Sequence, residues 1–175
     1  MRLLVLYTVL LVSSQITAQT KNLYDFNAKT ILGKDLDFST LKGKKVLIVN
    51  TASKCSLAPQ FKKLQELYEE YDLEILAFPS NDFGRREPED NETIYEFCTK
   101  KYNITFQMME KISVKGEDQH PLYKWLTSSD ENGTLDAKVT WNFQKFLIDE
   151  HGEIVDVVPP LKGPKCNRII DWLSE

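Results

Sequence analysis

The sequence predicts an α/β domain in which helices flank a central mixed β-sheet. Residues 45–78 read as strand, helix and strand with short connections, a pattern typical of a βαβ unit with parallel strands. Near the C-terminus, the strand patterns of residues 139–148 and 153–158 are joined by turn residues 149–152, which favours an antiparallel hairpin. Since one sheet would then hold parallel and antiparallel pairs, it is expected to be mixed.

The first half of the chain supplies the βαβ unit. Residues 30–38 alternate in polarity around a Gly-Lys turn and predict a hairpin. The apolar run 46–49 lies within residues 45–50 and suits a strand buried on both faces. Pro59 is tolerated in a first helical turn, and the residues after it repeat at helical spacing. A second buried strand is predicted over residues 73–78.

The second half is predicted to contain three helices. After a turn-rich loop, Asn91 can cap a helix over residues 92–102. A shorter helix is predicted over residues 121–126, and a last one begins at Pro164. There is no repeat or linker after residue 18, so residues 19–175 are expected to form a single domain.

The first 18 residues have the layout of a secretory signal peptide. Met1 and Arg2 give a positive start, an apolar run follows over residues 3–12, and residues 16–18 (ITA) resemble the small-residue pattern before a cleavage point. The run is far shorter than the roughly 20 residues that a membrane-spanning helix needs. We therefore expect an exported protein, periplasmic or secreted, with no stable membrane association once the signal peptide is removed.

Charge and cysteine content narrow the possible functions. The formal net charge is -4 at pH 7 and the basic residues are scattered, so a nucleic-acid partner is not expected. Three cysteines are an odd number for a disulfide framework, which indicates at least one free or reactive thiol. His120 and His151 show no metal-ligand spacing, and we expect neither a metal nor a cofactor.

Cys55 is the candidate nucleophile. It lies between the end of a predicted buried strand and the first turn of a predicted helix, where unpaired backbone N–H groups and the helix terminus favour a thiolate. Lys54 adds a nearby cation. The alternative is an inert thiol in a loop, but free cysteines of that kind are usually buried among apolar residues, whereas Ser53 and Ser56 stand close to this one.

Three segments resemble motifs of the glutathione peroxidase family. Residues 49–60 (VNTASKCSLAPQ), residues 78–84 (FPSNDFG) followed by Glu87-Pro88, and residues 141–143 (WNF) match them in order and spacing. The similarity extends from about Leu23 to the C-terminus. It implies a thioredoxin-like fold and a thiol-dependent, antioxidant peroxidase. In such an enzyme, responding to oxidative stress, Cys55 would reduce hydrogen peroxide and organic hydroperoxides through a sulfenic acid.

The resemblance also implies the residues beside Cys55. Trp141 and Asn142 match the family's indole and amide donors, although Trp141 could instead be a core aromatic residue. Adjacent strand residues face opposite sides, so presenting both requires a bend or a strand end. Asp82 stands where the family has glutamine, and an ionised carboxylate cannot donate a hydrogen bond. Asp82 could accept a proton, be held protonated, or point away while Asn81 helps.

Two routes could reduce the sulfenic acid again. Cys98 resembles the resolving cysteine of thioredoxin-using family members, which implies a disulfide with Cys55 and a thioredoxin-like dithiol as reductant. The alternatives are a core role for Cys98 and direct reduction by glutathione. Cys166 is expected to have no catalytic role, and the short segment 128–139 points to a monomer. In another functional class, the chain could be a redox sensor or relay that passes oxidation from Cys55 to a partner protein.

Overall fold

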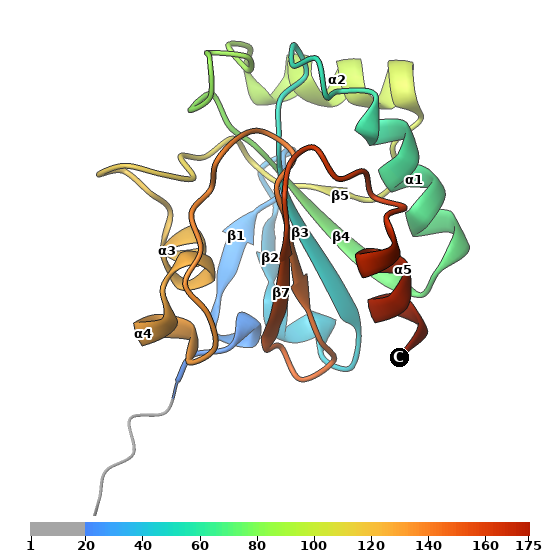
Figure 1. The fold of residues 1–175 in the computed structure, drawn as a ribbon. Helices are drawn as coiled ribbons and strands as arrows, with labels where there is room; N and C mark the ends of the chain where they lie inside the picture. Colours follow the sequence, from blue (N-terminus) through green and yellow to red (C-terminus); the bar gives the residue numbers. More distant parts are fainter. Residues whose placement is uncertain (1–19) are drawn as a thin grey trace, which may run out of the picture.

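A five-stranded sheet forms the centre of the computed structural model, which describes residues 20–175 (Figure 1). The strand order is β5-β4-β3-β6-β7. The strands are β3 (Lys45–Thr51), β4 (Leu73–Pro79), β5 (Gln107–Met108), β6 (Lys145–Ile148) and β7 (Ile154–Val158). Because β3 pairs in parallel with β4 and antiparallel with β6, the prediction of a mixed sheet is confirmed. The predicted signal peptide, residues 1–18, lies outside the described residues.

Helices cover both faces of this sheet. Figure 1 shows α1 and α5 on one side and α3 and α4 on the other, with α2 across one end. The helices are α1 (Gln60–Glu70), α2 (Asn91–Tyr102), α3 (Pro121–Thr127), α4 (Ser129–Asn132) and α5 (Asn167–Ser174). A separate hairpin of β1 (Asn27–Lys29) and β2 (Asp35–Asp37) is flanked by the 3₁₀ turns η1 (Leu23–Asp25) and η2 (Phe38–Leu41).

The side chains of β3 alternate between two hydrophobic clusters. Leu47 and Val49 pack with residues of α1, α2 and α5, whereas Val46 and Ile48 pack with residues of α3. Successive residues of a strand point to opposite faces. The unbroken apolar run therefore serves both faces of the sheet, as its pattern predicted.

The predicted strand over residues 139–148 is wrong in its first half. Phe143 has φ 69°, a left-handed conformation that an extended strand does not contain, and β6 begins only at Lys145. Residues 141–143 form a turn before that strand. The sequence pattern does not show this turn, because Val139 and the aromatic residues favour a strand locally.

Helix starts also differ from the prediction by a few residues. Asp90, not Asn91, caps α2, because its Oδ1 accepts a hydrogen bond from Thr93 N at 2.8 Å. The side chain of Asn91 instead accepts from Lys111 N at 2.9 Å. The last helix, predicted from Pro164, begins at Asn167 with Cys166 as its N-cap.

The periodicity of the sequence does not locate the shortest strands and helices of the structure. The 30–38 hairpin is present, but its strands lie at residues 27–29 and 35–37 around the turn of residues 30–34. Neither the two-residue strand β5 nor the four-residue helix α4 was predicted. Both are shorter than the windows over which periodicity can be recognised.

Lys145 is a buried cation at the start of β6. Its Nζ donates to Gln60 Oε1 at 2.5 Å, to the Lys162 carbonyl at 2.6 Å and to the Pro160 carbonyl at 3.4 Å. These bonds join β6, α1 and the loop before α5. Burial lowers the pKa of Lys145 to about 7, while the nearby thiol of Cys166 acts in the opposite direction.

We expect Lys145→Met to change the pH dependence of stability. Between pH 7 and 10.5 the unfolded chain binds more protons at this lysine than the folded protein does, so this group makes wild-type stability rise with pH. The difference in unfolding free energy between wild type and variant should therefore grow, by at most about 1.4 kcal/mol per pH unit. Urea unfolding at pH 7 and pH 9 measures it. The exposed Lys62→Met is the control, and a pH-independent difference for Lys145→Met would contradict the prediction.

Candidate active site

Cys55 lies in a series of tight turns between β3 and α1. Its N–H donates to the Ala52 carbonyl at 3.3 Å, and its carbonyl accepts from Ala58 N at 3.0 Å. The Leu57 N–H donates to Cys55 Sγ at 3.4 Å. The sulfur thus meets a backbone donor, as predicted, although this donor belongs to the turn and α1 begins only at Gln60. Such an N–H favours negative charge on the sulfur.

Asn50, near the end of β3, binds the turn that carries Trp141. Its Nδ2 donates to the Trp141 carbonyl at 3.0 Å, and its Oδ1 accepts from Gln144 N at 3.2 Å. Its backbone carbonyl accepts from Phe143 N at 2.6 Å. The third motif is therefore fixed to the strand from which the Cys55 turn emerges.

The second motif binds to the chain segment that connects β3 to Cys55. Ser80 N donates to the Thr51 carbonyl at 3.0 Å, and Lys54 N donates to the Arg86 carbonyl at 3.0 Å. The Lys54 ammonium forms an ion pair with Glu89, so the predicted cation beside Cys55 already has an acidic partner. All three motif segments meet at the carboxyl end of β3.

Trp141 is not a core residue. Its side chain is 41% exposed, and its ring packs on Phe83 with centroids 5.7 Å apart. A Cβ at Gly84 would make an ordinary van der Waals contact with the Trp141 ring at 3.5 Å, so it is the φ of +63° that favours glycine there. The alternative of a buried structural tryptophan is excluded by this exposure.

Asn142 sits beside Trp141 in the turn but is fully buried. Its Nδ2 donates to the Phe83 carbonyl at 3.4 Å, and its Oδ1 has no partner among residues 20–175. The positive φ of Phe143 bends the chain directly after it. Trp141 and Asn142 thus lie in a turn and not in a regular strand, and they differ in exposure.

Asp82 directs its carboxylate at a neighbouring loop. Its Oδ2 accepts from Val114 N at 2.7 Å, and its Oδ1 accepts from Ser113 Oγ at 3.5 Å. Asn81 Oδ1 is likewise occupied, by Glu87 N at 3.0 Å. These contacts favour the alternative in which the Asp82 side chain points away, towards residues 113–114.

Cys98 is fully buried on α2, in one cluster with Ile94. Burial, and secondarily the charge of Glu87, raise the pKa of the Cys98 thiol to about 12. Cys98 is therefore a protonated thiol at neutral pH in this conformation. All three cysteines are free in the described part of the chain, and Cys166 is half-buried.

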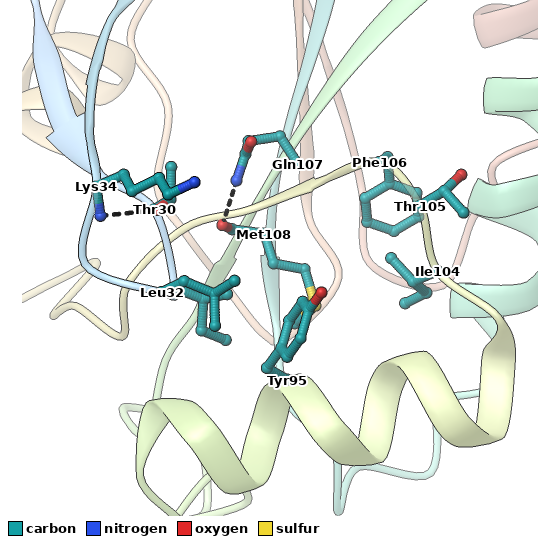
Figure 2. A pocket seen from close by; sticks show the side chains of 10 residues that line it. Thr30, Leu32, Lys34, Tyr95, Ile104, Thr105, Phe106, Gln107 and Met108 are labelled. Atoms are coloured by element: carbon teal, nitrogen blue, oxygen red, sulfur yellow. Dashed lines mark hydrogen bonds between the residues drawn. The ribbon is translucent and has the colours of Figure 1, made fainter.

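A pocket of about 340 Å³ lies beside α2, at the β5 edge of the sheet (Figure 2). It is lined by the 30–34 turn, by Tyr95 and by residues 104–108. Leu32 at its rim is 57% exposed. None of the three motif segments contributes to it, so this pocket is separate from the surroundings of Cys55.

Sequence reasoning assigned no role to Asn50 or Glu87. The one feature of the sequence that sets Asn50 apart is its polar side chain directly after the apolar run of residues 46–49. For Glu87 the sequence shows only a place in the second motif. The two histidines lie apart, His120 at the start of α3 and His151 in the β6–β7 turn.

Residues 20–175 offer neither a metal site nor a membrane-spanning helix. This part of the chain contains no group of three or more His, Cys, Asp or Glu side chains that could hold a metal ion. None of its helices has the length and apolar character to cross a membrane.

Comparison with known proteins points to one family. The family model described as "Glutathione peroxidase" matches residues 23–127. A glutathione peroxidase of Lactococcus lactis subsp. cremoris is 44% identical over 82% of this chain and 93% of its own length. A glutathione peroxidase-like peroxiredoxin of Saccharomyces cerevisiae is 44% identical over 83% of this chain and 91% of its own length.

Solved structures agree with the fold. The crystal structure of T. cruzi GPX1 superposes with a TM-score of 0.66 at 30% identity, covering 88% of this chain and 95% of the other. A thioredoxin family thiol:disulfide interchange protein of Chlorobium tepidum has a TM-score of 0.61 at 18% identity, covering 90% of this chain and 99% of the other. The second likeness concerns the fold alone, and the prediction of a thioredoxin-like fold is confirmed.

We expect Asp82→Ala to destabilise the protein by about 1–3 kcal/mol, because Val114 N would lose its acceptor in a partly buried loop. Asp82→Asn keeps an acceptor oxygen and should cost less than about 1 kcal/mol. Urea unfolding of both variants tests this. Equal stability of Asp82→Ala and wild type would show that the contact with Val114 is not a stabilising one.

Proposed function

Because this chain belongs to the glutathione peroxidase family and is a thiol-dependent peroxidase, we propose that Cys55 is the thiolate that attacks the hydroperoxide. The observation that carries this proposal is the convergence of three motif segments on the chain around Cys55. They are joined by hydrogen bonds that Asn50 and Lys54 donate and by one that the Thr51 carbonyl accepts. Trp141 is exposed at this edge of the sheet, whereas Cys55 itself is buried, with 7% of its surface exposed.

In the first step, the Cys55 sulfur bonds to the distal oxygen of hydrogen peroxide or an organic hydroperoxide. The O–O bond breaks, and the remaining oxygen takes a proton and leaves as water or an alcohol. Cys55 is thereby oxidised to a sulfenic acid. Donors aimed at the leaving oxygen lower the barrier, because negative charge develops there. The Trp141 indole and the Asn142 amide are the donors that we assign to this role.

In the second step, the Cys98 sulfur attacks the sulfenic acid and forms a Cys55–Cys98 disulfide, releasing water. A thioredoxin-like dithiol then reduces this disulfide and becomes oxidised itself. Cys98 must first leave its buried position through local opening of α2, since its raised pKa keeps it protonated there. The peroxiredoxin names of relatives from yeast and Chlamydomonas reinhardtii agree with such a thiol cycle.

Glutathione is the alternative reductant, because it could reduce the sulfenic acid without Cys98. The redox sensor or relay is the alternative function. The burial of Cys98 favours this alternative function, because a slow reaction of Cys98 with the sulfenic acid would leave time for a partner protein to react with Cys55. Turnover with a dithiol reductant separates these possibilities, since a sensor cycles far more slowly than a peroxidase.

The setting of the enzyme is part of the same proposal. We assign residues 1–18 to a signal peptide and the mature protein to the periplasm or the exterior. We propose that the mature protein is a monomer, because residues 128–139 form only α4 and a short connection. Asp82 supports the site through the 113–114 loop.

Cys55→Ser should abolish peroxide consumption, because no other described thiol lies where the three motifs meet. Wild-type protein treated with one equivalent of hydrogen peroxide should lose two hydrogens in intact mass, with peptide mapping to a Cys55–Cys98 bridge. Cys166→Ser is the control and should behave like wild type. Near-normal peroxide consumption by Cys55→Ser would contradict the assignment of Cys55 as the attacking thiolate.

Cys98→Ser should stop turnover supported by thioredoxin while leaving the first oxidation of Cys55 intact. The expected product after one equivalent of peroxide is a gain of one oxygen at Cys55, without a bridge. Steady-state assays with thioredoxin and with glutathione, run side by side, measure the effect. If the variant cycles normally with thioredoxin, Cys98 is not the resolving residue.

A further inference from the structure

Glu87 is a fully buried acidic residue in the loop before α2. Among residues 20–175, no Lys, Arg or His forms an ion pair with its carboxylate. A buried carboxylate without an ion-pair partner costs several kcal/mol unless hydrogen bonds compensate for the lost hydration. Its oxygens must therefore be well satisfied by other donors.

Both donors come from a single residue, Ser53. The Ser53 N–H donates to Glu87 Oε2 at 2.6 Å, and the Ser53 hydroxyl donates to Glu87 Oε1 at 2.5 Å. Hydrogen bonds to a charged acceptor are stronger than neutral ones. Glu87 is itself held in place, because its N–H donates to Asn81 Oδ1 at 3.0 Å.

Ser53 stands two residues before Cys55, at the start of the turns that shape the site. The next residue, Lys54, is bound through its N–H to the Arg86 carbonyl at 3.0 Å. Its exposed ammonium pairs with Glu89. Glu87 thus holds this turn through buried hydrogen bonds. The ion pair between Lys54 and Glu89 is exposed to solvent, where ion pairs contribute little to stability.

The anchored turn determines what the Cys55 sulfur meets. Leu57 N–H reaches Sγ at 3.4 Å only while residues 53–57 keep this conformation. We propose that Glu87 is a positioning residue: through Ser53 it holds the turn in which the Leu57 N–H meets the Cys55 sulfur. The inference rests on the proposed function, in which Cys55 is the attacking thiolate.

The charges around Glu87 are consistent with this role. Burial raises the pKa of Glu87, whereas the Ser53 hydrogen bonds and the charges of Lys111 and Lys54 lower it. The charge of Glu87 in turn helps to raise the pKa of the Cys98 thiol on α2. Perturbed titratable groups of this kind gather at functional sites.

The test isolates the first oxidation in a Cys98→Ser background. The second-order rate of Cys55 oxidation by hydrogen peroxide is measured between pH 5 and pH 9 by acid quench and intact mass. Glu87→Ala and Glu87→Gln are compared, since both remove the charge. Only the amide keeps an acceptor for the Ser53 N–H and a group that can bond the hydroxyl.

We expect Glu87→Ala to oxidise about tenfold more slowly at pH 7 than Glu87→Gln, and to need a higher pH to reach its full rate. Ser53→Ala should slow the reaction in the otherwise unchanged background. It should have little further effect when combined with Glu87→Ala, because the two side chains act as one unit. Glu89→Ala, which breaks only the exposed ion pair, is the matched control and should change the rate less than about twofold.

The possible outcomes distinguish a failure of the positioning role of Glu87 from a failure of the proposed function. Equal rates and pH profiles for Glu87→Ala, Glu87→Gln and the background protein would overturn the positioning role. Additive effects of Ser53→Ala and Glu87→Ala would do the same, as would a rate loss that only follows the unfolded fraction seen by circular dichroism. If the background protein itself leaves Cys55 unoxidised, the proposed function fails, whatever the variants do. Should Glu87→Ala not fold, Ser53→Ala and Glu87→Gln still give the comparison.

Discussion

Asn50, the next-to-last residue of β3, binds the 141–144 turn through its side chain and its backbone at once. These bonds matter because Asn50 lies at the edge of the sheet where β3 and β4 both end. Thr51 follows it and pairs with Pro79 at the end of β4, so the loops after both strands leave the sheet at the same edge. Parallel strands place their carboxyl ends together, and β6 begins at this edge because it runs antiparallel to β3. Three motifs that are distant in sequence therefore share one place.

Polar groups are buried at this edge at a cost in stability. Thr51 Oγ1 and Asn142 Oδ1 have no hydrogen-bond partner among residues 20–175, and Glu87 keeps an acidic group away from water. Elsewhere in the sheet such positions are apolar and packed on both faces. Two more buried atoms without a partner in the described part of the chain, Tyr123 Oη and Trp172 Nε1, lie on α3 and α5, so what distinguishes this edge is the buried carboxylate of Glu87 among residues that we assign to chemistry.

The two proposed redox cysteines are both buried and belong to the same hydrophobic cluster. Cys55 lies in a turn whose shape depends on hydrogen bonds, whereas Cys98 lies on helix α2. The proposed reaction between them would require α2 to open, and this opening would compete with the burial of Ile94 and its neighbours. In the proposed cycle, the stability of this helix would therefore set how fast the Cys55 sulfenic acid is resolved.

The sequence by itself determined the mixed sheet, the buried strands β3 and β4, the main helices and the three motif segments, because periodicity and motif order are local properties. Only the tertiary structure decided how those segments function together. The turn of Trp141 depends on Asn50, the direction of Asp82 on Val114, and the anchoring of Ser53 on Glu87. Each contact joins residues more than 30 positions apart. Such contacts arise from how the strands and loops pack, which no local pattern records.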